Sequence, residues 1–507
     1  MYSTVRLIGE SDDGKCGYCG DSESNTITDV LTAQDYKILM DSGWRRCGRL
    51  TYKPNNRKTC CPAYTIRCDA VNFRISKAQK KVLRVVNTYL NTGEIVKADA
   101  QCSATADCRG DRPIELDSLP CSSQNISLHA SGDSGFPFGR KADPVSTSRP
   151  GSARRRRWQA LQDRMARRAE KLGVSYEIIL EEYLVRRRRR LDKNKPKELE
   201  QYLESMHGEA KAAHFIDVRM YSCSTRRPEF EATLDEEFKL YSAYQVAVHN
   251  DPPEKLKRKS FTRFLVDSPL VVRALSCSST VASSSTRYCA HDAEAEASGA
   301  PQFGTYHQQY WLDGEKLVAV GVIDLVPGCL SSVYFFYDPA YAFLRLGTYS
   351  ALREIAFVRQ LHRAYGSAVP AYTDFTQYYM GHYIHSCVKM RYKAQYSPSY
   401  LVCSETYAWV PLAKCRRLLD RSKYTRFADG DVEKASSVDV GKAVILFPFS
   451  THLASLLPPS QFTVEGNVIT TTAAAAMRLL TKHGFRLLQD WINLVCSTGT
   501  MRINYSH

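Results

Sequence analysis

The sequence lacks an apolar run long enough to span a bilayer, and its first ten residues lack the apolar core of a signal peptide. These absences argue against a membrane-spanning or secreted protein, so we expect no membrane partner and a cytoplasmic location. We also find no internal repeat along the 507 residues.

Acidic residues are too few to balance the cations. There are 69 Lys and Arg against 53 Asp and Glu, which gives a net charge of +16 and an isoelectric point of about 9.1. Such an excess favours a polyanionic partner, with nucleic acid ahead of an acidic membrane surface. The alternative is a solvated basic surface without a partner. A hydrophobic fraction of 44% fits a globular protein of two or three domains.

Cysteine is abundant, and its arrangement near the N-terminus is informative. Among the 17 cysteines, Cys16 and Cys19 form one pair and Cys60 and Cys61 another. Thiolates paired within one short region are typical ligands of a soft metal or an iron–sulfur cluster. Adjacent Cys60 and Cys61 fit one tetrahedral zinc poorly, so either a multi-iron cluster binds there or only one of them ligates. Buried or redox-active thiols without metal are the alternative.

Composition and periodicity divide the chain into five expected segments of an α+β protein. They are an N-terminal cysteine-containing domain (1–90), a flexible Ser/Asp/Gly/Pro linker (91–150), an arginine-rich segment (151–207), a folded C-terminal domain with a disordered insertion at 274–300 (208–430), and a tail (431–507).

The arginine-rich segment has 12 Arg and 1 Lys against 5 acidic residues between 151 and 190. Spaced apolar residues predict interrupted helices within it. Either it contacts tRNA or directs the protein to the nucleus, or it is a solvated, partly disordered helical linker.

Residues 317–326 predict a central strand, because they are apolar on both faces. Asp324 is its only charge, and a carboxylate there is costly unless it is paired or positioned for use. A carboxylate bonded to a neighbouring turn is the alternative. The next strand (331–337) leads to a turn at Gly347 and a helix (348–363), an arrangement that presents backbone N–H groups to a phosphate.

Several of these stretches resemble arginyl-tRNA–protein transferases. Cys16-Gly-Tyr-Cys19, Thr59-Cys-Cys-Pro-Ala-Tyr-Thr-Ile-Arg and Ser76-Lys-Ala-Gln-Lys-Lys-Val-Leu are similar to the N-terminal domain of that family. Gly304-Thr-Tyr-His-Gln-Gln-Tyr-Trp-Leu-Asp, 331–361 and 379–392 are similar to its C-terminal domain. The resemblance leaves out 91–190, 274–300 and 450–475.

The resemblance implies a C-terminal fold similar to the GCN5-related acyltransferases. Relatives that use acetyl-CoA hold its pyrophosphate at the turn corresponding to Gly347, but this chain lacks their fuller glycine-rich turn, so no acetyl-CoA is expected. The implied donor is arginyl-tRNA. The implied acceptor is a protein that begins with Asp, Glu or oxidised Cys, and the product is a signal for ubiquitin-dependent degradation. The family also raises iron–sulfur and zinc as possibilities for Cys16, Cys19, Cys60 and Cys61.

The implied transfer of arginine from tRNA to a protein requires a base, an anionic group for the arginyl side chain, a cationic pocket for the acidic acceptor and a basic surface for tRNA. We expect Asp324 as the base or in the arginyl pocket, followed by His307 and Glu354, although His307 could equally be a core-facing histidine. For the acceptor we expect Arg67 and either Arg45 or Arg46, with Lys389 and Arg391 as alternatives. For tRNA we expect Lys77, Lys80, Lys81, Gly347 and the arginine-rich segment.

Two other functional classes compete with an arginyltransferase. A non-enzymatic RNA-binding adaptor with a metal-stabilised module would use the same charge and the same arginine runs. The predicted strand, turn and helix, together with the family resemblance, disfavour it. A CoA-dependent acetyltransferase is the weaker third hypothesis.

Overall fold

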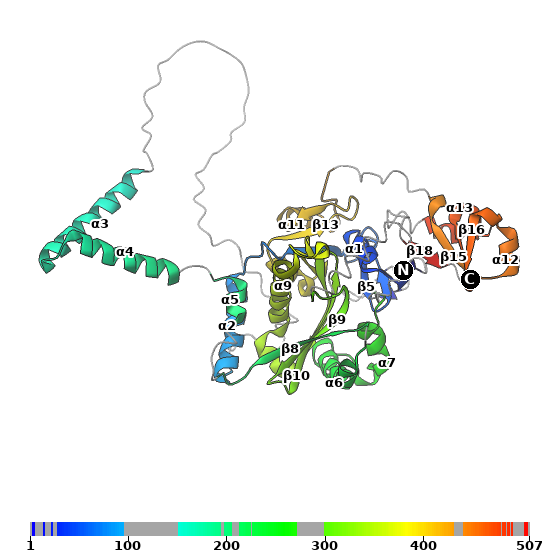
Figure 1. Cartoon of the computed structure of the whole chain (residues 1–507), viewed down its shortest axis with the longest axis horizontal. Coiled ribbons are helices and arrows are strands. Elements are labelled where there is room, and N and C mark those ends of the chain that lie inside the picture. Colours follow the sequence, from blue (N-terminus) through cyan, green and yellow to red (C-terminus); the bar gives the residue numbers. More distant parts are fainter. Residues whose placement is uncertain are drawn as a thin grey trace, which may run out of the picture. The chain divides into compact units, whose positions relative to one another are not determined.

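The structure is a computed structural model (Figure 1) that describes residues 31–95, 151–193, 197–204, 212–224, 226–270, 299–429 and 440–477, with parts of 3–30 and 479–504. Most of the expected linker, nearly all of the expected insertion, and both Cys16 and Cys19 lie outside these residues. The chain forms two compact units, one from residues 1–112 and 198–507 and the other from residues 113–197.

An eight-stranded sheet is the centre of the larger unit, in the order β14-β13-β7-β12-β11-β10-β9-β8. The strands are β7 (Tyr64–Asp69), β8 (Ile216–Ser222), β9 (Gly304–Leu312), β10 (Lys316–Val326), β11 (Cys329–Tyr337), β12 (Gln377–Tyr383), β13 (Ser399–Val402) and β14 (Trp409–Pro411). Strands β8 to β11 are antiparallel neighbours, whereas β11 and β12 are parallel and are connected through α9 (Leu346–Tyr365).

Strand β7 comes from the N-terminal segment but lies between β12 and β13 of the C-terminal segment. The two segments expected to form separate domains therefore share one sheet. Periodicity in a sequence carries no information on which strands pair with one another, so this insertion was not predicted.

Both faces of the sheet are covered, as the apolar composition of β10 predicted. Ile323 and Leu325 pack with α9 and α2 (Lys77–Thr92) on one face. On the other face, Val320 and Val322 pack with α6 (Pro228–Tyr244), α7 (Arg258–Phe261) and the π-helical turn η3 (Thr262–Val266). Asp324 is on this second face, since side chains alternate along a strand.

The second face also carries N-terminal elements. They are α1 (Ala33–Asp41), which Thr32 caps, and the hairpin of β5 (Arg45–Cys47) and β6 (Leu50–Tyr52). Helix α2 has a capping box at its N-terminus, in which Ser76 and Gln79 each bond the other's backbone N–H.

The connection from β11 to α9 differs from the prediction. A 3-10 helix, η4 (Pro339–Leu344), follows β11, and Arg345 adopts a left-handed conformation with φ of 52° directly before α9. Gly347 is the second residue of α9, so the expected glycine turn is wrong: Arg345 makes the turn and Gly347 is helical.

Residues after 430 form more than the expected tail. They contribute four strands to a six-stranded sheet in the order β16-β17-β15-β18-β1-β4. The members are β1 (Ser3–Val5), β4 (Thr28–Val30), β15 (Val444–Pro448), β16 (Phe462–Glu465), β17 (Val468–Thr472) and β18 (Met501–Asn504). The sequence signal was weak because these strands are only four or five residues long, and because β18 pairs with β1 from the other end of the chain.

The shorter elements complete the description of the larger unit. They are β2 (Gly14–Lys15), β3 (Ser22–Glu23), α5 (Leu199–Glu204), η1 (Gln245–His249), η2 (Pro253–Lys255), η5 (Pro370–Tyr372), α10 (Val388–Arg391), η6 (Tyr392–Gln395), α11 (Leu412–Leu419), η7 (Val440–Lys442), α12 (Thr451–Leu456), η8 (Pro459–Gln461) and α13 (Ala473–Ala476). In the part of the chain that the structure covers, no helix is both long and apolar enough to cross a membrane.

The smaller unit is a pair of helices, α3 (Gly151–Leu172) and α4 (Tyr176–Lys193). The two helices contact each other through the buried side chains of Met165, Ala169 and Ile179. The arginines on these helices whose side chains the structure describes are exposed. The predicted helices are therefore confirmed.

Candidate active site

The parallel strands β11 and β12 part in the middle of the large sheet. They pair only over three residues each, from Cys329 opposite Gln377 to Ser331 opposite Tyr379. Beyond Tyr379 the register of β12 against β7 shifts, and Gly381 takes a φ of +73° that a side chain would strain. Pairing between β11 and β12 therefore ends at the centre of the sheet, with the bulge of β12 beside that point, which we call the opening.

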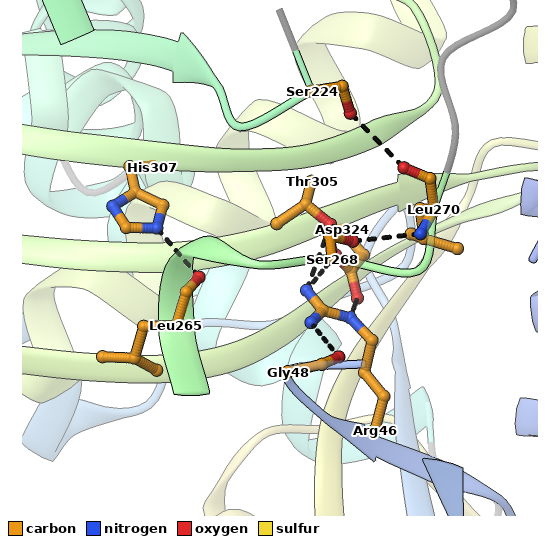
Figure 2. Close-up of polar contacts among 9 residues, drawn as sticks. All are labelled: Arg46, Gly48, Ser224, Leu265, Ser268, Leu270, Thr305, His307 and Asp324. Atoms are coloured by element: carbon orange, nitrogen blue, oxygen red, sulfur yellow. Dashed lines mark hydrogen bonds and ion pairs between the residues drawn. The ribbon is translucent and has the colours of Figure 1, made fainter. Parts of the chain in front are cut away.

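Asp324 lies on the second face of the sheet in a buried ion pair (Figure 2). Arg46, from the β5–β6 hairpin, donates from Nε to Asp324 Oδ2 at 2.7 Å and from Nη2 to Oδ1 at 2.6 Å. Thr305 donates to the same Oδ1 at 2.6 Å, and neither charged side chain is exposed. The remaining guanidinium nitrogen, Nη1, bonds the carbonyl oxygen of Gly48.

This geometry brings together two residues that the sequence assigned to different tasks. With three hydrogen bonds to its oxygens and no exposure, Asp324 is well placed to fix the hairpin on the sheet. A bidentate pair of this kind holds both partners in one orientation. The arrangement favours a positioning role for Arg46 and Asp324 over contact with substrate.

His307 is also fully buried and paired. Its Nδ1 lies 2.7 Å from Glu237 Oε2, and its Nε2 lies 3.1 Å from the carbonyl oxygen of Leu265. Burial lowers the pKa of His307, but the Glu237 carboxylate outweighs it and raises that pKa well above the ordinary value. The ring therefore carries two N–H groups and donates both, which ties β9 to α6 and η3.

Glu354 differs from the other two candidates because one of its oxygens is unpartnered. Oε2 accepts a hydrogen bond from the Tyr378 hydroxyl at 2.8 Å, whereas buried Oε1 has no partner. Burial raises the pKa of Glu354 to about 7, against the effect of the Tyr378 and Ser332 hydroxyls. Glu354 projects from α9 onto the first face of the sheet, where Tyr378 and Ser332 mark the parting strands.

A cluster of cations surrounds Tyr379 on the second face. Arg45 lies over the ring with its guanidinium carbon 5.4 Å from the centroid, and Lys37 lies at 5.6 Å. Arg67, opposite Tyr379 on β7, approaches the hydroxyl at 3.4 Å and stacks on Trp409 at 3.9 Å. The hydroxyl donates to Asp41 at 2.5 Å. Buried Nε of Arg67 has no hydrogen-bond partner, so this guanidinium retains donor capacity.

A cleft of about 470 Å³ opens beside this cluster. It lies at the end of the parallel pair where the strands are joined, not at the end where they part. Its lining comprises Gln34, Lys37, Arg67, Phe303, Pro327, Gly328, Pro370, Ala371, Asp374 and Gln377. Lys37 and Arg67 bring two cations to this lining against the one carboxylate of Asp374, and Lys37 is also ion-paired with Asp41. Arg67 is therefore the cation of the lining that best suits an anionic ligand.

The other predicted residues lie farther from this cleft or outside it. Lys389 and Arg391 are exposed on α10, so their alternation with Met390 and Tyr392 occurs in a short helix and not in a strand. On α2, Lys77 and Lys81 are exposed and Lys80 lies 5.7 Å from the ring centroid of Tyr202. These lysines form a basic helix face of the larger unit.

Only half of the predicted metal site can be located. Cys60 is half-buried and Cys61 buried, and both pack near Ile384 and Cys387. Among the residues that the structure describes, no three His, Cys, Asp or Glu side chains could hold one metal ion. Because Cys16 and Cys19 lie outside those residues, the iron–sulfur or zinc site stays a prediction.

Sequence reasoning missed Lys37, Asp41 and Tyr379 in this site. Asp41 and Lys37 lie one helical turn apart on α1 and form an ion pair, but nothing in the sequence of that helix indicates that it lies against β12. The one available signal was Gly381, because a glycine inside a strand often marks a place where a ligand or another backbone approaches closely.

Comparisons with known proteins agree with the resemblance found in the sequence. Residues 14–81 match the family profile "Arginine-tRNA-protein transferase, N terminus", and residues 236–403 match the profile "Arginine-tRNA-protein transferase, C terminus". Most of the residues discussed above, including β7, β9 to β12 and α9, fall within these two ranges.

Full-length relatives are also similar. Arginyl-tRNA–protein transferase 1 of Drosophila melanogaster is 35% identical over 466 residues, which is 84% of this chain and 85% of the relative. Arginyl-tRNA–protein transferase 2 of Arabidopsis thaliana is 33% identical over 518 residues, or 86% of this chain and 80% of the relative. A shorter match, 32% over 101 residues, is to an aspartate/glutamate leucyltransferase of Campylobacter jejuni and covers 20% of this chain and 36% of that protein. The chain therefore belongs to the arginyl-tRNA–protein transferase family of aminoacyltransferases.

Proposed function

We propose that this chain transfers arginine from arginyl-tRNA to the α-amino group of proteins that begin with Asp or Glu, and that oxidised Cys is a further acceptor. The arginylated product is a signal for ubiquitin-dependent degradation. Family membership supports the donor and the reaction. The structural observation that supports the acceptor class is Arg67, which lines the cleft beside Tyr379 and retains an unpartnered buried donor. The name of the leucyltransferase relative includes aspartate and glutamate, which agrees with an acidic acceptor.

The opening between β11 and β12 is the proposed place of reaction. The order of antiparallel strands, a parallel pair and a connecting helix agrees with the GCN5-related fold that the resemblance implies. The N-terminus of α9 faces the donor in this arrangement, and its first N–H groups suit a phosphate of the tRNA 3′ end. No acetyl-CoA takes part in the proposed reaction.

We assign the arginyl side chain to Glu354. Asp324 and His307 have their polar atoms occupied, whereas Glu354 retains one buried oxygen without a partner. A guanidinium that approached this oxygen would supply the missing donor and favour the ionised carboxylate. On the opposite face Arg67 and Arg45 would take the acidic acceptor, so the two substrates meet at the opening in the sheet.

The α-amine of the acceptor attacks the ester carbonyl of the donor. The carbon–oxygen bond to the tRNA breaks and an amide forms. The proton that the amine loses is balanced by the proton that the departing tRNA oxygen gains, which leaves a free tRNA hydroxyl. Because the ester is already activated, the enzyme contributes chiefly by holding the two groups in line and by stabilising the oxyanion. The tRNA body would lie on basic surfaces, for which Lys77, Lys80, Lys81 and the arginines of α3 and α4 are the candidates.

The four cysteines are proposed to hold an iron–sulfur cluster or zinc as a structural support. Cys60 and Cys61 precede β7, the strand that carries Arg67. A metal at that position would order the start of β7 and so the acceptor side of the site. Purification without oxygen, followed by metal analysis of wild type and of a Cys60→Ser, Cys61→Ser double variant, tests this assignment.

Transfer of radiolabelled arginine from charged tRNA tests the function as a whole. We expect incorporation into a peptide that begins with Asp and none above background into the same peptide with Ala first. Binding of tRNA without any transfer would contradict the proposal and favour a non-enzymatic RNA-binding adaptor.

A further inference from the structure

Two buried cations lie at the bulge of β12 without a carboxylate partner among the described side chains. Arg45 is 5% exposed and Lys393 is 7% exposed. Lys393 Nζ donates to the carbonyl oxygen of His382 at 2.7 Å, and Arg45 Nη2 donates to the carbonyl oxygen of Gly381 at 3.3 Å. The left-handed backbone at Gly381 lies next to both groups, since a side chain there would come within 3.9 Å of Lys393 Nζ.

Three more polar atoms around these cations have no partner. They are Nε of Arg45, Oγ1 of Thr65 and Nε2 of His382, all of them buried. Thr65 on β7 is the cross-strand neighbour of His382 on β12, so their side chains lie together. Buried polar atoms in native proteins are nearly always hydrogen-bonded. A group of them around two like charges indicates a place for a ligand.

The electrostatics agree with a missing anion. Burial lowers the pKa of Lys393 to about 7, and Arg45 lowers it further. Burial also lowers the pKa of His382 well below its ordinary value, with the same direction of effect from Arg45 and Lys393. His382 is therefore neutral. No carboxylate contributes to either shift; the Cys387 thiol opposes the shift of Lys393, and a hydrogen bond with the backbone of Gly43 opposes that of His382. An anion between Arg45 and Lys393 would relieve the repulsion that these shifts record.

We propose that Arg45, Thr65, His382 and Lys393, together the bulge site, bind the side-chain carboxylate of the acceptor's first residue, with Lys393 as a specificity-determining residue. This inference rests on the proposed function and locates its acceptor pocket. The site is small and buried, with two cations and a hydroxyl, which suits a single carboxylate. The phosphates of a folded tRNA would require an exposed surface. Arg45 also lies over Tyr379, so the bulge site adjoins the cluster that contains Arg67.

A purely structural role is the alternative. Lys393 would then only support the bulge through its bond to the His382 carbonyl, and its loss would weaken binding of every acceptor equally. The two roles differ in their dependence on the first side chain of the acceptor, so a comparison of Asp with Asn, which has the same shape without the charge, separates them.

The test measures binding of two fluorescent peptides, one beginning with Asp and the other with Asn, to the full chain without tRNA. We expect wild type to prefer Asp, and Lys393→Met to lose at least about tenfold in affinity for Asp while affinity for Asn changes less than about twofold. Lys393→Arg should retain part of the preference. Lys414→Met, a change of an exposed lysine on α11, is the matched control and should leave both affinities unchanged.

An unchanged Asp preference in Lys393→Met, or an equal loss for both peptides, would overturn the bulge site. If that variant does not fold, Thr65→Val removes an unpartnered hydroxyl without any change in charge, and it should still weaken binding of the Asp peptide selectively. Arginine transfer by wild type separates this inference from the proposed function. If wild type transfers arginine to the Asp peptide and the variants keep the preference for Asp over Asn, only the bulge site is refuted. If wild type transfers no arginine at all, the proposed function is refuted.

Discussion

Arg46 and Asp324 are 278 positions apart in the sequence and form a bidentate ion pair in which neither side chain is exposed. The pair joins the β5–β6 hairpin to the central strand β10. Because Arg45 is the neighbour of Arg46 in the same hairpin, the pair also fixes the position of Arg45 beside β12. Gly48 at the hairpin turn fits closely against η3, where a side chain would clash with the carbonyl oxygen of Arg263.

The first prediction concerns this pair. Asp324→Asn leaves the Arg46 charge buried without a counter-charge, so we expect it to lower the free energy of unfolding by about 3–5 kcal/mol. Urea denaturation measures the change. Replacement of both residues by apolar ones, Arg46→Met with Asp324→Leu, should cost less than Asp324→Asn alone.

The exposed pair of Arg57 and Glu405 is the control for that measurement, because Arg57 is 69% exposed. Arg57→Met should change the free energy of unfolding by no more than about 1 kcal/mol. If Asp324→Asn had full stability but reduced transfer, Asp324 would be a catalytic group after all, and the positioning role would be wrong.

The second prediction concerns His307. Since both ring nitrogens are bonded within the core, His307→Asn should lower stability and leave the turnover of the folded fraction within about threefold of wild type. Turnover is measured per folded molecule, with the folded fraction taken from circular dichroism. A loss of turnover by more than about a hundredfold in a stable variant would instead indicate a catalytic base.

The third prediction is a pH dependence that arises from Glu354. Burial raises its pKa in the folded protein from an ordinary value of 4.5 to about 7. The folded state therefore holds this proton more tightly than the unfolded state. The stabilising effect is fully present below pH 4.5 and is lost as the pH rises through 7, and it amounts to about 3 kcal/mol.

Glu354→Gln has no such proton and provides the comparison. Between pH 4 and pH 8.5, the unfolding free energy of wild type minus that of Glu354→Gln should therefore fall by about 3 kcal/mol. A constant difference over this range would show that the pKa of Glu354 is the same in the folded and unfolded states, in contradiction to its buried environment.

Sequence patterns predicted the local structure well and the tertiary arrangement poorly. The all-apolar strand β10 was recognisable because its pattern is encoded by adjacent residues. The pairing of Arg46 with Asp324 and the insertion of β7 beside β12 depend on contacts between distant segments, which periodicity does not report. Gly347 was misplaced for a related reason: glycine is common in turns, but here Arg345 takes the left-handed conformation.

The residues of the candidate site show the same difference between what adjacent residues encode and what only the tertiary structure reveals. Arg67, Arg45 and Glu354 could be named from their residue type and their neighbours in the sequence. Lys37 and Lys393 could not, because each becomes notable only through burial or through the cleft it lines. Charge in a sequence indicates a partner of opposite sign, but only the fold shows which cations lack one.

The central claim is that the two substrates bind on opposite faces of one sheet, with arginine at Glu354 and the acidic acceptor at Arg67 and Arg45. A crossed kinetic experiment tests it most directly. Transfer is measured for wild type, Glu354→Gln and Arg67→Met with acceptor peptides beginning with Asp or Asn. We expect Glu354→Gln to lower kcat/KM with the Asp peptide by about a hundredfold through loss of a buried charge pair, without a change in the Asp preference.

Arg67→Met should have the complementary effect: it should reduce the Asp preference by about tenfold and leave the KM for arginyl-tRNA unchanged. An Asp preference that is lost in Glu354→Gln, or one that is unaffected in Arg67→Met, would contradict the assignment of the two substrates to the two faces.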